Sequence, residues 1–123
     1  KIIKKSNALL IDRGDLSRYV PIEKMPIAQE SIIKRSIKLN TPTYVATNLL
    51  ESMIKENQPS RAESHDIYST IKEGAEGLVL AAETAIGKNP IECVRFIKRC
   101  IAVCNKDKQK LKKEDIDNYL FRL

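Results

Sequence analysis

The sequence is poor in the residues that most often carry metal, redox and nucleic-acid chemistry. It has no tryptophan, one histidine and three cysteines, and its aromatic residues are four tyrosines and two phenylalanines. So few aromatic side chains offer no stacking platform for single-stranded nucleic acid. His65 has no nucleophile or metal-ligand spacing around it, so we expect it at the surface or near a helix cap.

The cysteines and the apolar runs exclude further classes. Cys93, Cys100 and Cys104 lie in one predicted helical segment, and a disulfide between the first two would span about 10 Å of helix axis. We therefore predict buried, reduced thiols and a reducing, cytoplasmic location. No apolar run approaches the roughly 20 residues of a membrane-spanning helix, so no membrane partner is expected.

The charge is basic but evenly mixed. Lysine and arginine number 22 against 16 acidic residues, a net charge of +6, and the two signs are interleaved along most of the chain. Nucleic acid is therefore not an expected partner. The densest basic tract, Lys106 to Lys113, is predicted to be a solvated helix or tail. We divide the chain into a folded unit at 1–105 and a charged, helical C-terminal extension at 106–123.

The chain repeats a strand, a polar turn and a helix three times. The predicted strands cover 8–11, 43–46 and 77–82, and the first is expected to be buried on both faces. This α/β pattern is typical of a doubly wound sheet or a (β/α)8 TIM barrel. Three units cannot close a barrel. We therefore expect an incomplete barrel whose sheet edges are covered by the rest of a longer chain or by a homo-oligomer partner.

The predicted helices carry recognisable ends and buried faces. Ser60 and Glu63 form a capping box, Gly74 supplies a left-handed stop, and Pro90 opens the last helix with Glu92 placed to reach back. The first helix, 23–39, and the last are each expected to bury one apolar stripe. The stripes comprise Ala28, Ile32, Ile33, Ile37 and Leu39 in the first and Val94, Ile97, Ile101 and Cys104 in the last.

Polar groups follow each apolar run. Arg13, Gly14 and Asp15 follow the first strand, where Asp15 is a hard oxygen ligand, Gly14 admits close backbone approach and Arg13 is a fixed positive charge. Thr47 and Asn48 follow the second strand. The alternative interpretation makes Asp15 a turn former without chemistry.

Three stretches resemble the later barrel strands of the pyruvate kinase family. LLIDRGDL at 9–16 is similar to its strand-six signature, PTYVATNLLESMIKENQPSRAESHDI at 42–67 to its strand-seven stretch, and GLVLAAETAIGKNPIECV at 77–94 to its strand-eight stretch. The similarity covers roughly residues 6 to 104 without a large gap. It implies three consecutive βα units of a TIM barrel and an enzyme that transfers phosphate from phosphoenolpyruvate to ADP.

The resemblance also implies roles for individual residues. Asp15 would be a ligand of Mg²⁺ or Mn²⁺, the amides of Gly14 and Asp15 would hold the substrate carboxylate, and Thr47 would contact the same small acid. Arg13, Asp15 and Thr47 would be the catalytic residues of this segment. The substrates would be phosphoenolpyruvate or pyruvate and ADP or ATP. K⁺ is implied as well, but the family's K⁺ ligands, and its strand-five Lys and Glu, have no counterpart within these residues.

Departures from the family pattern leave alternatives open. Asn48 replaces a usual Gln, Ser17 a usual Gly, and Ala81-Ala82 the usual Ser-Gly. One alternative is a degenerate, non-catalytic barrel module that binds itself or another protein. Another is a carbon-carbon lyase for small 2-oxo acids, which would keep Asp15 as its metal ligand. The leading hypothesis is a pyruvate kinase family enzyme, of which this segment alone is inactive.

Overall fold

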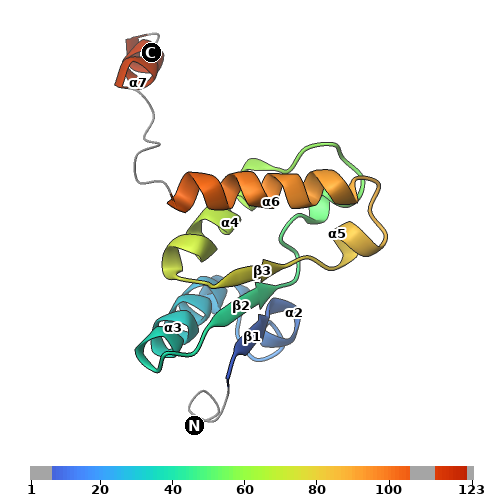
Figure 1. Cartoon of the computed structure of the whole chain (residues 1–123), viewed down its shortest axis with the longest axis vertical. Coiled ribbons are helices and arrows are strands. Elements are labelled where there is room, and N and C mark those ends of the chain that lie inside the picture. Colours follow the sequence, from blue (N-terminus) through green and yellow to red (C-terminus); the bar gives the residue numbers. More distant parts are fainter. Residues whose placement is uncertain (1–6, 106–112, 122–123) are drawn as a thin grey trace.

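A three-stranded parallel sheet forms the centre of the molecule. The computed structural model describes residues 7–105 and 113–121. Strands β1 (Leu9–Asp12), β2 (Thr43–Ala46) and β3 (Gly77–Val79) lie in the order β1-β2-β3. The central row of the sheet pairs Ile11 with Val45 and Val45 with Leu78. Figure 1 shows this sheet with the long helices beside it.

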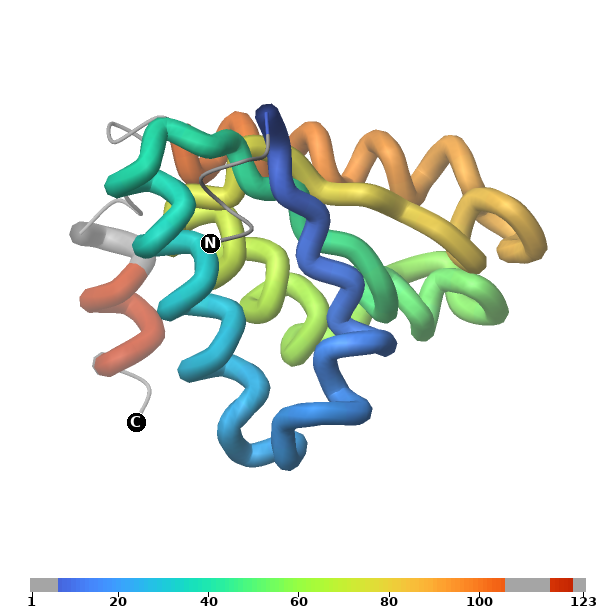
Figure 2. Tube along the Cα trace, turned by 90° about the horizontal axis from the view of Figure 1, so that it is seen from below, coloured from blue at the N-terminus to red at the C-terminus, as the bar shows by residue number. Residues whose placement is uncertain are grey.

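Helical segments connect and flank the strands. In Figure 2 the chain leaves β1, turns at the lower edge and returns as α3 before entering β2. The long helices are α3 (Met25–Lys38), α4 (Arg61–Glu73) and α6 (Pro90–Asn105). The shorter segments are α2 (Arg13–Leu16), η1 (Ile22–Lys24), η2 (Glu51–Ile54), α5 (Ala82–Ala85) and α7 (Lys113–Phe121). The predicted order of three βα units is confirmed.

The core consists of two apolar clusters joined through β3. Ile11 and Val45 of the sheet pack against Ile33 of α3, which is fully buried. The second cluster fills the space between η2, α4 and α6, and its members are Leu49, Leu50, Met53, Ile67, Cys93 and Ile97. Leu78 packs against both clusters.

The other face of the sheet is open, which corrects one prediction. Leu10 is 56% exposed and Val79 is 40% exposed, so β1 is not buried on both faces. Side chains alternate across a strand, and only the Ile11 side of β1 meets a helix. Tyr44 lies beside Gly77, where an added Cβ would come within 2.8 Å of the tyrosine ring.

The sequence predicts the ends of the helices better than it predicts which of their faces are buried. Ser60 and Glu63 form both bonds of the capping box, and Gly74 adopts φ 109°. Along α3, however, the buried residues are Gln29, Ile33 and Ser36, while Ile37 is 51% exposed. Gln29 enters the interior because its amide donates to Thr70 and Glu73 of α4.

The last helix and the third strand also differ from expectation. Val94 is exposed, because the buried face of α6 centres on Cys93 and Ile97. Glu92 pairs with Arg95 at 2.7 Å rather than reaching back to the helix start. The third strand ends at Val79 and not at Ala82.

Three remaining sequence expectations concern thiols, membranes and the C-terminal segment. All three cysteines are free, as predicted, but only Cys93 is fully buried. Within the described residues, no helix is both long and apolar enough to cross a bilayer. Residues 106–112 of the basic tract lie outside the described residues, and α7 begins at Lys113.

Candidate functional site

The carboxyl ends of β1 and β2 bring four predicted site residues to one edge of the sheet. Arg13, Gly14 and Asp15 begin directly after β1, and Thr47 follows β2. Because the two strands are parallel and pair Asp12 with Ala46, the next residues along each strand meet above the same edge.

The carboxylate of Asp12 is the centre of this edge. Its Oδ1 accepts hydrogen bonds from the Gly14 amide at 3.0 Å, the Asp15 amide at 3.3 Å and the Thr47 hydroxyl at 2.8 Å. Chiefly the Thr47 hydroxyl, followed by the Asp15 amide, holds the pKa of Asp12 below its usual 3.8. Two amides of α2 and the hydroxyl of the residue after β2 thus form a binding site for one carboxylate oxygen, which we call the carboxylate seat.

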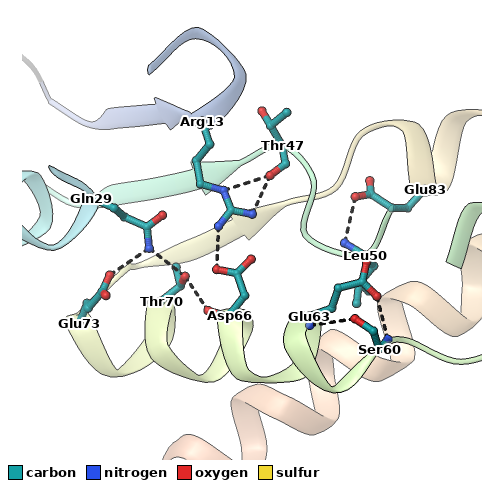
Figure 3. A network of polar contacts seen from close by, with 10 residues as sticks. All are labelled: Arg13, Gln29, Thr47, Leu50, Ser60, Glu63, Asp66, Thr70, Glu73 and Glu83. Atoms are coloured by element: carbon teal, nitrogen blue, oxygen red, sulfur yellow. Dashed lines mark hydrogen bonds and ion pairs between the residues drawn. The ribbon is translucent and has the colours of Figure 1, made fainter. Parts of the chain in front are cut away.

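Arg13 connects the same edge of the sheet to α4. Its Nε and Nη2 donate to the Thr47 carbonyl at 3.0 and 2.7 Å, and its Nη1 donates to Asp66 at 2.7 Å (Figure 3). The Arg13 side chain is only 15% exposed. It is therefore committed to joining β1, β2 and α4.

The backbone after β2 adopts an unusual conformation. Thr47 has φ 83° and Asn48 has φ 58°, in the left-handed region that β-branched residues rarely enter. The Thr47 carbonyl is held by Arg13, and the Thr47 hydroxyl points to Asp12. Strained backbone persists where its surroundings hold it from several sides.

Asp15 is the carboxylate available for a cation. Its side chain is exposed and has no protein partner within the described residues. Those residues hold no cluster of three histidine, cysteine or acidic side chains. Mg²⁺ commonly binds through one or two carboxylates and completes its shell with water and substrate phosphates. The chemistry of Asp15 therefore fits one ligand of a magnesium site, and the described residues place no further cluster of such ligands around it.

The end of β3 is built differently. Glu83 is 2% exposed, and its two carboxylate oxygens accept the amides of Leu50 at 3.1 Å and Ala81 at 2.8 Å. This bridge turns the chain into α5 and explains why β3 is shorter than predicted. Glu83 therefore links the β3 tip to the residues before η2.

Sequence reasoning missed Asp12 and Asp66. A carboxylate just before a turn and two residues before a glycine is a local signature of an N-cap, so the Asp12 contact had a readable signal. Asp66 had none, because 53 residues separate it from Arg13 and only the fold brings them together.

The repeated βα units, with polar side chains at the carboxyl ends of their strands, are typical of a segment of a (β/α) barrel. The pyruvate kinase barrel domain matches residues 1–94. The chain therefore belongs to the pyruvate kinase family.

Individual relatives agree with this assignment. The chain is 46% identical over 99 residues to the pyruvate kinase of Thermotoga maritima, covering 80% of this chain and 21% of that protein. It is 47% identical to the chloroplastic isozyme G of Ricinus communis, covering 78% of this chain and 23% of the relative. A crystal structure of a pyruvate kinase from Cryptosporidium parvum superposes with a TM-score of 0.84 at 34% identity, covering 88% and 22% of the two chains. This chain thus spans about a fifth of the length of these relatives.

Proposed function

We propose that this chain is the part of a pyruvate kinase that carries its sixth to eighth barrel strands. The whole enzyme would transfer the phosphoryl group of phosphoenolpyruvate to ADP and protonate the resulting enolate, which yields pyruvate and ATP in glycolysis. The observation that carries the proposal is the convergence of two amides and one hydroxyl on a single carboxylate oxygen in a member of this family.

Each site residue receives a role that its contacts support. The Gly14 and Asp15 amides and the Thr47 hydroxyl would bind the substrate carboxylate, and the Asp15 side chain would bind Mg²⁺. When bound, the metal would neutralise charge on the phosphoryl oxygens. Arg13, which the sequence placed among the catalytic residues, would act as a positioning residue, because its guanidinium is engaged by Thr47 and Asp66.

The chain alone would be inactive. Among the described residues, Asp15 is the one exposed carboxylate at this edge without a protein partner, whereas catalysis needs a fuller set of ligands, and Ala81 and Ala82 bring no hydroxyl to the end of β3. The remaining barrel units of a longer parent chain would supply the other groups, including those for K⁺. The free thiols favour a reducing compartment such as the cytoplasm.

A lactate-dehydrogenase-coupled assay tests the proposal. In the parent chain, Asp15→Ala should lower kcat about a hundredfold or more, because charge stabilisation at the transition state is lost. Asp117→Ala removes an exposed carboxylate from α7 and should leave turnover unchanged. Equal activity of the two variants would contradict the role of Asp15. Mg²⁺-dependent turnover by the 123-residue chain alone would contradict its inactivity.

A second candidate function is a non-catalytic barrel module that assembles through its sheet. The exposed face of the sheet, with Leu10, Tyr44 and Val79, favours it. Light scattering on the 123-residue chain separates the two: a monomer argues against assembly, whereas a defined oligomer without turnover in the parent chain supports it.

A further inference from the structure

The carboxylate seat at the ends of β1 and β2 already holds a carboxylate of the chain itself. The donors that the proposed function assigns to the substrate are the Gly14 amide, the Asp15 amide and the Thr47 hydroxyl, and all three donate to Oδ1 of Asp12. An amide has one hydrogen to donate, and so has a hydroxyl. A ligand carboxylate can therefore use these donors only in place of Asp12.

The seat is shaped for a carboxylate oxygen by the absence of a side chain at Gly14. A Cβ on Gly14 would lie 3.2 Å from Oδ1 of Asp12, which is tighter than ordinary van der Waals contact, and 3.4 Å from Cγ2 of Thr47. The glycine thus leaves room for an oxygen between the two strand tips. The space for this oxygen therefore depends on the missing side chain of Gly14 as well as on the two amides.

The donors of the carboxylate seat should keep their positions when the Asp12 side chain moves away. Thr47 is held through its carbonyl by Arg13, which is anchored in turn to Asp66 of α4. None of these bonds involves Asp12 (Figure 3). The Thr47 backbone therefore stays at the strand tip, which keeps its hydroxyl within reach of another carboxylate, and the freed donors can bind that carboxylate. Asp12 itself is exposed, so its side chain can turn into solvent.

We propose that Asp12 is a specificity-determining residue that competes with small carboxylate ligands for the seat formed by Gly14, Asp15 and Thr47. This inference rests on the proposed function, which gives the seat its substrate. A ligand binds at the cost of moving Asp12 aside. Its apparent affinity is therefore reduced by the fraction of molecules in which Asp12 occupies the seat. A negative charge so near also disfavours any ligand that lacks an accompanying cation.

Titration of the full chain with acetate, followed through the amide resonances of Gly14 and Asp15, tests this inference. Asp12→Ala empties the seat and should bind acetate about tenfold more tightly than the wild type. Asp12→Asn keeps a neutral acceptor on the same amides and should fall between the two. Glu76→Ala removes one exposed charge just before β3, at the opposite edge of the sheet, and should match the wild type.

The two possible roles of Asp12 predict opposite orders of affinity. If Asp12 only supports the local fold, Asp12→Ala should bind acetate more weakly than the wild type, and Asp12→Asn should restore wild-type affinity. That order, or no shift of these amides in any variant, would overturn the inference. Turnover of phosphoenolpyruvate by the parent chain is measured separately. Its absence alongside the expected acetate order would overturn only the proposed function, and its presence without that order only the inference.

Discussion

The carboxyl ends of β1 and β3 are held by the same type of hydrogen bond, which has a different role at each end. At each tip a carboxylate accepts two backbone amides: Asp12 takes those of Gly14 and Asp15, and Glu83 takes those of Leu50 and Ala81. Asp12 is exposed, whereas Glu83 is 2% exposed. Water can replace Asp12 but cannot reach the Leu50 amide, which is fully buried. Burial therefore separates an exchangeable contact from a structural one.

The largest effect should come from removing the buried carboxylate. Glu83→Ala leaves the buried Leu50 amide without an acceptor and should lower the free energy of unfolding by about 3 kcal/mol. Urea denaturation measures the change. Glu76→Ala is the matched control, because Glu76 is an exposed glutamate just before β3 and its loss should leave the midpoint unchanged. Similar midpoints for the two variants would contradict the structural role of the buried Glu83 carboxylate.

The next effect should come from the arginine that joins the tip of β2 to α4. Arg13→Lys keeps the charge but loses the paired bonds to the Thr47 carbonyl, and should cost about 1.5 kcal/mol of stability. In a double-mutant cycle with Asp66→Asn we expect a coupling of about 1 kcal/mol.

The chain supplies a matched control for Arg13. Arg95 pairs with Glu92 at the same 2.7 Å, but both side chains are well exposed, at 64% and 46%. Arg95→Lys should therefore change stability by less than about 0.5 kcal/mol. Comparable losses at Arg13 and Arg95 would indicate that the strand-tip contacts of Arg13 add nothing.

A smaller and pH-dependent effect is expected at Glu63. Burial would raise the pKa of Glu63, but hydrogen bonds from Ser52 and Ser60 outweigh it and hold the pKa below the usual 4.5. The lowered pKa gives stability that is present above pH 4.5 and is lost as the pH falls through the folded-state pKa. Glu63→Gln should cost about 1 kcal/mol at pH 7. Unfolding curves at falling pH should show this gap closing, and a gap independent of pH would contradict the role of the charge.

The difference between local and long-range contacts also decides which features could be predicted from the sequence. Local signals were sufficient for the capping box of α4 and the left-handed Gly74, because each depends on neighbours within a few residues. The same holds for the polar triplet after β1. The early end of β3 was missed because it depends on Glu83 reaching the distant Leu50 amide, and the link from Arg13 to Asp66 likewise needs the folded chain.

The smallest loss of stability should come from substituting Asp12, although the same substitution should strengthen ligand binding. Asparagine caps a helix about as well as aspartate, so Asp12→Asn keeps the amide contacts. The lowered pKa of Asp12 still means that the charged form favours the fold above pH 3.8, an advantage lost as the pH falls through its folded-state pKa. We expect a slight decrease of the urea midpoint at pH 7 that disappears in acid. Glu83→Gln should lower the midpoint far more, because a glutamine has one acceptor oxygen and its NH2 group would face one of the two backbone amides that Glu83 accepts. If both substitutions cost the same, exposure would not explain the difference between the tips. If Asp12→Asn costs little yet strengthens acetate binding, the bond that steadies the tip of β1 is also the one that a ligand must break.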